Sequence, residues 1–155
     1  MITMKSMLVA VDFSKQSILA AKFAASLAQE YDSKLYVLHV RAHLPIYAQT
    51  EMVDYEAFQR RVTEEDRAAL SRVIPQTIKG MIPVEEILQL GSPAHHVIVR
   101  TAKELDVDLL VISTHGRTGL AHVMIGSVAE HVIRHAPCPV FVVRNPKDKF
   151  VYGWE

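Results

Sequence analysis

The stretch LLVISTHGRTGLAHVMIGSVAEHVIRHAPCPVFVV, residues 109–143, decides the predicted fold of this chain. It contains an apolar run at 109–112, a loop with three glycines, a helical segment from Ser127 and a second apolar run at 140–143. Neither run alternates between apolar and polar residues, which is typical of strands covered on both faces of a mostly parallel sheet. A strand, a loop, a helix and a further strand in this order predict one βαβ unit of an α/β fold.

Three further runs of strand length lie upstream, at 7–11 (MLVAV), 35–40 (LYVLHV) and 84–90 (VEEILQL). The first two hardly alternate, whereas the third is more polar and is therefore expected at an edge of the sheet. Helical patterns separate the runs, so the predicted order of elements is βαβαβαβαβ. This alternation implies right-handed crossovers and an open α/β sandwich within one domain.

Four helical segments connect the runs, and each has a sequence signal at its start or end. Ser14 is expected to cap the first segment, and Pro75 to end the second. Ser92-Pro93 begins the third, and the capping box Ser127-Val-Ala-Glu130 opens the fourth. The apolar side chains expected to face the sheet are Leu19, Phe23, Leu27 and Tyr31, then Phe58, Val62, Ala69 and Val73, then Ile98, Ala102 and Leu105.

Composition argues against several classes of protein. The 17 Lys and Arg residues balance 17 Asp and Glu residues, so the chain has no long-range field to hold a nucleic acid. The single cysteine, Cys138, excludes an internal disulfide framework, and no apolar stretch approaches the roughly 20 residues needed to cross a membrane. We therefore expect a cytoplasmic protein with one domain over residues 1–145. The tail, residues 146–155, is either disordered or docks its aromatic side chains on a neighbour.

The candidate binding residues follow the strands, at the sheet edge where open α/β folds bind ligands. Gly126 and Ser127 stand where the last helix begins, and a helix N-terminus favours an anion through its unpaired N–H groups and its dipole. Asp12 follows the first strand, so its carboxylate is expected at the same edge. Under the alternative interpretation, Ser127 only caps a helix and Asp12 only complements the dipole of the first helix.

Three segments together resemble the universal stress protein family: VAVDFS (9–14), LYVLHV (35–40) and STHGRTGLAHVMIGSVAEHVIRHAPCPVFVVR (113–144). The resemblance covers almost the whole chain to about Arg144. It implies a Rossmann-like, adenine nucleotide α-hydrolase-like fold, in which four helices sandwich an open five-stranded parallel sheet of order 3-2-1-4-5. It also implies an adenine-nucleotide site and a homodimer formed through the C-terminal strand, Val140 to Val143.

The family's nucleotide-binding pattern is Gly, two residues, Gly, nine residues, then Gly followed by Ser or Thr. Gly116, Gly126 and Ser127 match its later part, whereas Ser113 replaces the first glycine and is expected to narrow the pocket beside the ribose. The expected ligand is ATP, ADP or AMP, with Mg²⁺ as an optional companion of ATP. The residues that the resemblance assigns to this ligand are Ala10, Asp12, Val40, Ser113, His115, Gly116, Arg117, Gly119, Gly126, Ser127 and Val128.

Function is open between a binding module and an enzyme. We expect a stress-response protein that changes conformation or partner affinity with its bound nucleotide, without catalytic residues and with at most weak ATPase activity. The alternatives are an ATP-hydrolysing or adenylating enzyme of the same fold class, and an interaction protein with an empty site. The sequence lacks both GxxxxGK[ST] and GxGxxG, which argues against a P-loop and against a GxGxxG dinucleotide site.

The remaining signals are interpreted as structural. His131 and His135 lie one helical turn apart but lack the glutamate of an HExxH motif, so no metal site is predicted there. They are expected to be solvated, and His95-His96 to be structural or exposed. Nothing near Cys138 activates its thiol. Residues 140–143 would form an aggregation-prone apolar edge unless a second subunit or the C-terminal tail covers them.

Overall fold

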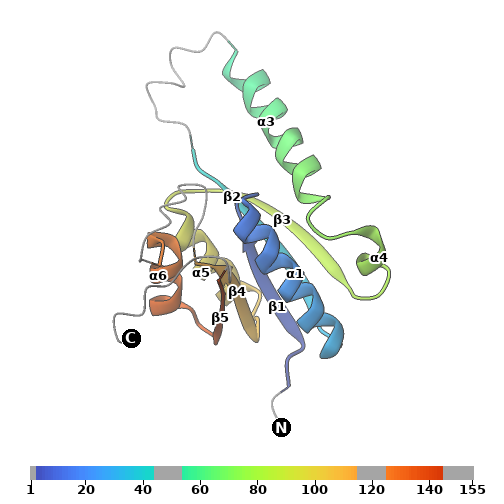
Figure 1. Cartoon of the computed structure of the whole chain (residues 1–155). Coiled ribbons are helices and arrows are strands. Elements are labelled where there is room, and N and C mark those ends of the chain that lie inside the picture. The colour runs from blue at the N-terminus through green and yellow to red at the C-terminus, as the bar shows by residue number, and fades with distance from the viewer. Residues whose placement is uncertain (1–2, 44–53, 115–124, 145–155) are drawn as a thin grey trace, which may run out of the picture.

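The computed structural model describes residues 3–43, 54–114 and 125–144, which form an open α/β sandwich (Figure 1). The strands are β1 (Ser6–Val11), β2 (Lys34–Arg41), β3 (Val84–Leu90), β4 (Leu109–Ser113) and β5 (Val140–Val143). They pair in parallel in the order β3-β2-β1-β4-β5, which confirms the predicted fold class and strand order. The helices of the described residues are α1 (Lys15–Glu30), α3 (Tyr55–Leu70), α4 (Gln76–Lys79), α5 (Ala94–Glu104) and α6 (Ser127–His135). None of these helices is long and apolar enough to cross a membrane.

Alternate residues of the strands form two cores on opposite faces of the sheet. Met7 and Val9 of β1 pack on one face against α1 and the residues that follow α3. Leu8 and Ala10 of the same strand pack on the other face against α5 and α6. Figure 1 shows this arrangement, with α1 in front of the central strands and α5 and α6 grouped beside β4 and β5. Because helices cover both faces, the central strands are mostly apolar on both faces and hardly alternate, as the sequence predicted.

The face of α1 that packs on the sheet differs from the predicted one. Phe23 and Tyr31, which were expected to face the sheet, are each 46% exposed. The buried residues of the helix are Ser17, Ala20, Ala21, Ala24, Ala25 and Ala28. Leu19 and Leu27 do pack against this core at its margin, as predicted. Small side chains let the helix backbone approach the sheet closely, so the centre of the packed face is the alanine stripe and not the row of large apolar residues.

The second predicted helix, which was expected to run up to Pro75, already ends at Leu70, and an additional short helix, α4, follows Pro75, so five helices rather than four accompany the sheet in the described residues. After α3 ends at Leu70, the N–H of Val73 donates to the Leu70 carbonyl in a turn, and Val73 and Ile74 lie in the core. Pro75 does not end α3 but stands at the N-cap of α4. Proline is tolerated there because the start of a helix requires no N–H from it.

Contact between α3 and the rest of the fold is concentrated in the second half of the helix. Its buried residues are Val62, Asp66 and Leu70, whereas Phe58 and Ala69, which were predicted to face the sheet, are only half-buried. Figure 1 shows the first half of α3 extending beyond the sheet. A carboxylate therefore lies in the middle of the packed surface, where it needs charged or hydrogen-bonding partners.

The N-termini of α5 and α6 also differ from the prediction. Pro93 rather than Ser92 is the N-cap of α5, and Gly126 rather than Ser127 is the N-cap of α6. The predicted capping box does not form, because Ser127 is not the N-cap residue, and Glu130 instead pairs with Arg134 of the same helix at 3.0 Å. Ser127 is therefore the first residue of α6, and its hydroxyl makes no capping hydrogen bond.

Candidate functional site

A cavity of about 280 Å³ lies between the ends of β1, β2 and β4 and the first turns of α5 and α6. β1 and β4 are neighbours in the sheet, and the helices that follow them, α1 and α6, cover opposite faces. The cavity therefore lies at the topological switch point, where open α/β sheets bind ligands. The described residues that line it are Ala10, Val11, Asp12, Ser17, Leu38, Val40, Ala94, Ile98, Ile112, Ser113, Thr114, Gly126, Ser127, Val128 and Ala129.

Most of the predicted binding residues meet in this cavity. Those that line it are Ala10, Asp12, Val40, Ser113, Gly126, Ser127 and Val128. The others, His115, Gly116, Arg117 and Gly119, lie outside the described residues. The fold thus brings together residues from three strands and a helix start, and their contact with a ligand stays a prediction.

Apart from Ala10 and Val40, the apolar wall of the cavity was not predicted from the sequence. Leu38 and Val40 line it from β2, Ile98 from α5 and Ile112 from β4. The two-residue period of a strand indicates Leu38 once Val40 has been assigned to the site. No comparable signal exists for Ile98, because only the crossover after β3 brings its helix to the cavity.

Asp12 is held in a short hydrogen-bonded loop between β1 and α1. Its Oδ1 accepts a hydrogen bond from the N–H of Ser14 at 3.0 Å, and its own N–H donates to Ser17 Oγ at 3.2 Å. Ser14 Oγ in turn accepts from the N–H of Ser17, which confirms Ser14 as the cap of α1. These bonds fix the backbone on both sides of the carboxylate, so Asp12 reaches the cavity from a loop of defined shape.

The first turn of α6 provides the donors of the site. The N–H of Gly126 is not one of them, because it donates to the Thr114 carbonyl at 2.7 Å. The N–H groups of Ser127, Val128 and Ala129 have no acceptor among the described residues. Of the predicted contacts for an anion, the amides of Ser127 and Val128 therefore remain available at the positive end of the helix dipole, the Ala129 amide joins them, and the Gly126 amide is withdrawn.

Together these features define the kind of ligand that the cavity can hold. The apolar wall suits a flat ring, and the Asp12 carboxylate accepts hydrogen bonds from hydroxyl or amino groups. The amides of α6 suit a phosphate or another anion. A ligand that combines a ring, hydroxyl groups and a phosphate matches this set of donors and acceptors.

A histidine stack lies on the surface of α5 and α6, whose first turns line the cavity. The ring centroids of His95 and His131 are 4.2 Å apart and the rings are nearly parallel, and His135 lies 5.9 Å from His131. His131 and His135 are exposed, as predicted, and together with His95 they form a cluster that was not predicted. Burial, followed by the charges of His131, His96 and His135, lowers the pKa of His95 below its ordinary value. The other charged groups of this α6 surface, Glu130 and Arg134, pair with each other.

The lowered pKa of His95 predicts that the protein loses stability in mild acid. An unfolded chain binds a proton on this residue near pH 6.5, whereas the folded chain binds it only at lower pH. The contribution of His95 to the free energy of unfolding should therefore be constant well above pH 6.5 and fall as the pH drops through 6.5. Urea unfolding at pH 7.5 and pH 5.5 measures the difference. His95→Gln should reduce this difference in the free energy of unfolding, whereas His43→Gln, outside the stack, should not. An equal difference in the unmodified protein and in both variants would contradict the prediction.

Comparison with known sequences finds relatives that match nearly the whole chain. The profile described as the Universal stress protein family matches residues 3–144. Universal stress protein MJ0531 of Methanocaldococcus jannaschii is 34% identical over 143 residues, which cover 92% of this chain and 84% of the relative. Putative universal stress protein SH1215 of Staphylococcus haemolyticus is 34% identical over 150 residues, covering 94% of this chain and 87% of the relative.

Solved structures agree with the sequence comparison. The hypothetical protein MJ0577 superposes with a TM-score of 0.81 at 26% identity, covering 94% of this chain and 99% of that one. A universal stress protein in complex with cAMP matches with a TM-score of 0.59 at 26% identity, over 92% of this chain and 98% of that one. The universal stress protein from Archaeoglobus fulgidus in complex with dAMP matches with a TM-score of 0.62 at 27% identity, over the same two shares.

Proposed function

Because this chain belongs to the universal stress protein family, we propose that its cavity binds an adenine nucleotide and that the bound nucleotide controls its conformation or its partners. The observation that carries the proposal is the juxtaposition of the Asp12 carboxylate and the α6 amides around one apolar cavity. Structural neighbours that hold cAMP or dAMP support it. The family relationship supports a role in stress response.

The dimensions of the cavity suggest how the nucleotide lies. Its volume of about 280 Å³ is at the small end of the range for small-molecule sites, roughly 300–1,000 Å³. The nucleoside would fill the apolar part, with Asp12 accepting hydrogen bonds from ribose or adenine. The phosphates would lie at the amides of Ser127, Val128 and Ala129. AMP, ADP and ATP share this core, and Mg²⁺ would accompany only the phosphate tail of ATP.

Calorimetric titration with AMP, ADP and ATP tests the proposal. We expect micromolar dissociation constants, which correspond to about 8 kcal/mol, and a higher melting temperature for the complex. GTP is the control, because it carries the same phosphates on a different base. Absence of both heat and a thermal shift at millimolar nucleotide would reject adenine-nucleotide binding.

We further propose a binding protein rather than an enzyme. Asp12 is the one carboxylate among the described residues that line the cavity, and its Oδ1 already accepts a hydrogen bond from Ser14. Such a carboxylate is suited to holding a hydroxyl group rather than to removing its proton. Turnover of ATP should therefore lie far below the roughly 1–10³ s⁻¹ of ordinary enzymes.

We also propose a cytoplasmic location, which suits a chain whose single cysteine can form no internal disulfide. Cys138 is half-buried, and burial together with the nearby charge of Asp108 raises the pKa of its thiol. A thiol with a raised pKa reacts slowly, so this residue is suited to persist reduced and unmodified.

A homodimer through β5 is the remaining part of the proposal. Phe141 of this edge strand is 40% exposed, and its ring lies 6.4 Å from that of the exposed Phe23. Antiparallel pairing with a second β5 would cover the edge and both rings. Sedimentation at micromolar concentration should give a dimer, and Phe141→Lys a monomer. Met81→Lys is the control, because Met81 is an exposed apolar residue in the turn before β3, the strand at the opposite edge of the sheet from β5. A monomeric unmodified protein would contradict the proposal.

A further inference from the structure

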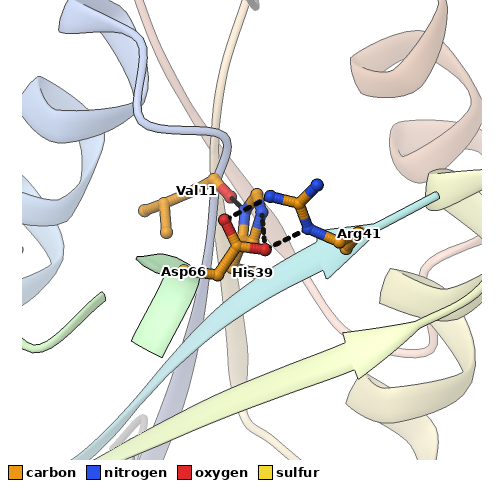
Figure 2. Close-up of polar contacts among 4 residues, drawn as sticks. All are labelled: Val11, His39, Arg41 and Asp66. Carbon is orange, nitrogen blue, oxygen red and sulfur yellow. Dashed lines mark hydrogen bonds and ion pairs between the residues drawn. The ribbon is translucent and has the colours of Figure 1, made fainter. Parts of the chain in front are cut away.

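A polar network joins Val11, the last residue of β1, to His39, Arg41 and Asp66 (Figure 2). His39 of β2 and Asp66 of α3 are 4% and 5% exposed. His39 Nδ1 lies 2.7 Å from the Val11 carbonyl oxygen, and His39 Nε2 lies 3.8 Å from Asp66 Oδ2. The guanidinium of Arg41 donates to both oxygens of Asp66, with 2.6 Å between Nη2 and Oδ1.

The chemistry of the partners fixes the direction of the key hydrogen bond. A carbonyl oxygen can only accept, so the hydrogen lies on His39 Nδ1 and is donated to Val11. The opposite ring nitrogen faces the Asp66 carboxylate. Asp66 thus faces the imidazole from α3 at 3.8 Å, beyond hydrogen-bond distance, while Arg41 fixes Asp66 through two hydrogen bonds.

His39 contacts the chain on both sides of Asp12. Val11, the residue before it, provides the carbonyl that the imidazole holds. Phe13, the residue after it, places its ring centroid 4.2 Å from that of His39. The backbone of Phe13 has φ of 65°, a left-handed conformation that a bulky residue keeps only when its surroundings hold it.

We infer that His39 is a positioning residue for the Asp12 carboxylate, and that Asp66 of α3 fixes His39 in that role. The imidazole holds the carbonyl before Asp12 and the aromatic ring after it, so it sets the direction in which the carboxylate leaves the backbone. The sequence gives no hint of this role, because His39 lies inside a run with the pattern of a buried strand. The consequence for ligand affinity rests on the proposed function.

Hydrogen exchange of single amides tests the positioning role without any nucleotide. The Ser14 amide donates to Asp12 Oδ1, and the Ile18 amide one turn later donates to the Ser14 carbonyl. His39→Leu should accelerate exchange at Ser14 at least roughly tenfold relative to Ile18. His39→Asn should restore most of the protection of the Ser14 amide that His39→Leu loses, because the Asn side-chain amide replaces the Nδ1 donor. His39→Gln should not restore this protection. Ser33→Ala, which removes a buried 2.6 Å hydrogen bond to Met4 at the other end of β2, should leave Ser14 unchanged.

A double-mutant cycle tests the consequence for binding. His39→Leu and Asp12→Asn should each weaken AMP binding about tenfold, and the double variant should bind no more weakly than Asp12→Asn alone. If the losses of AMP affinity from His39→Leu and Asp12→Asn were fully additive in the double variant, the inference would be overturned. Unchanged exchange of the Ser14 amide in His39→Leu and His39→Gln would overturn it as well. If the unmodified protein bound no nucleotide, the proposed function would fail, while Ser14 exchange would still decide whether His39 positions Asp12.

Discussion

Replacing Arg41 with leucine should lower the free energy of unfolding by about 3 kcal/mol, more than any other single change proposed for the polar residues of the fold. The substitution removes two hydrogen bonds from Asp66, a carboxylate whose side chain is only 7% exposed. The cost should lie at the lower end of the roughly 3–5 kcal/mol range for broken buried pairs. Arg41 itself is partly exposed, and His39 stays near the carboxylate.

Urea denaturation with a constant m-value measures this loss. Arg61→Leu is the matched control, because Arg61 lies on the exposed face of α3 and its contact with Glu65 is a solvent-exposed i,i+4 pair. It should change the free energy of unfolding by no more than about 0.5 kcal/mol. Replacing both partners, as Arg41→Leu with Asp66→Leu, should recover most of the loss. Equal effects of the two arginine substitutions would contradict a buried ion pair at Asp66.

The parallel sheet could be predicted because its physical cause lies in local sequence. Runs such as 7–11 and 109–112 are apolar at every position, and only strands covered on both faces tolerate that composition. The polar run at 84–90 was likewise correctly placed at an edge, where β3 lies. Strand order follows less directly from composition, and it was the resemblance of the segments around Asp12 and Gly126 that implied it.

Helix faces were harder to predict, because large side chains dominate any pattern of hydrophobicity. In α1 the alanines pack on the sheet and Phe23 lies outside, beside Phe141 of β5. The network around Asp66 could not be predicted at all. Charged residues are expected at the surface, and Arg41 and Asp66 are 25 residues apart in the chain, so only the packing of α3 reveals that they pair.

The candidate site combines both situations. Asp12 and the start of α6 could be placed at one sheet edge because strands and helix starts are visible in the sequence. Which amide of α6 is available could not, because the answer depends on the hydrogen bond from Gly126 to the Thr114 carbonyl. Because of that bond, Gly126 cannot donate to a ligand. Its predicted role is instead to leave room for the ligand, since it has no side chain, and this role can be tested directly.

Gly126→Val should weaken ATP binding at least about tenfold, a loss of roughly 1.4 kcal/mol, while leaving the fold intact. Gly126 has φ of −60° and ψ of 151°, a conformation that any residue adopts, so the backbone does not require glycine at this position. Gly126 does line the cavity, immediately before the amides of Ser127 and Val128. A branched side chain there would occupy the space through which a phosphate reaches those amides.

Calorimetry of ATP and adenosine separates this steric effect from general damage. Adenosine carries no phosphate, so its affinity should fall much less than that of ATP in Gly126→Val. Gly80→Ala is the control for glycine replacement, because a Cβ there would meet only ordinary contacts at 3.6 and 3.7 Å in the turn after α4. It should leave both affinities unchanged. If Gly126→Val lost ATP and adenosine equally, or bound ATP as well as the unmodified protein, the phosphates would not lie at the first turn of α6.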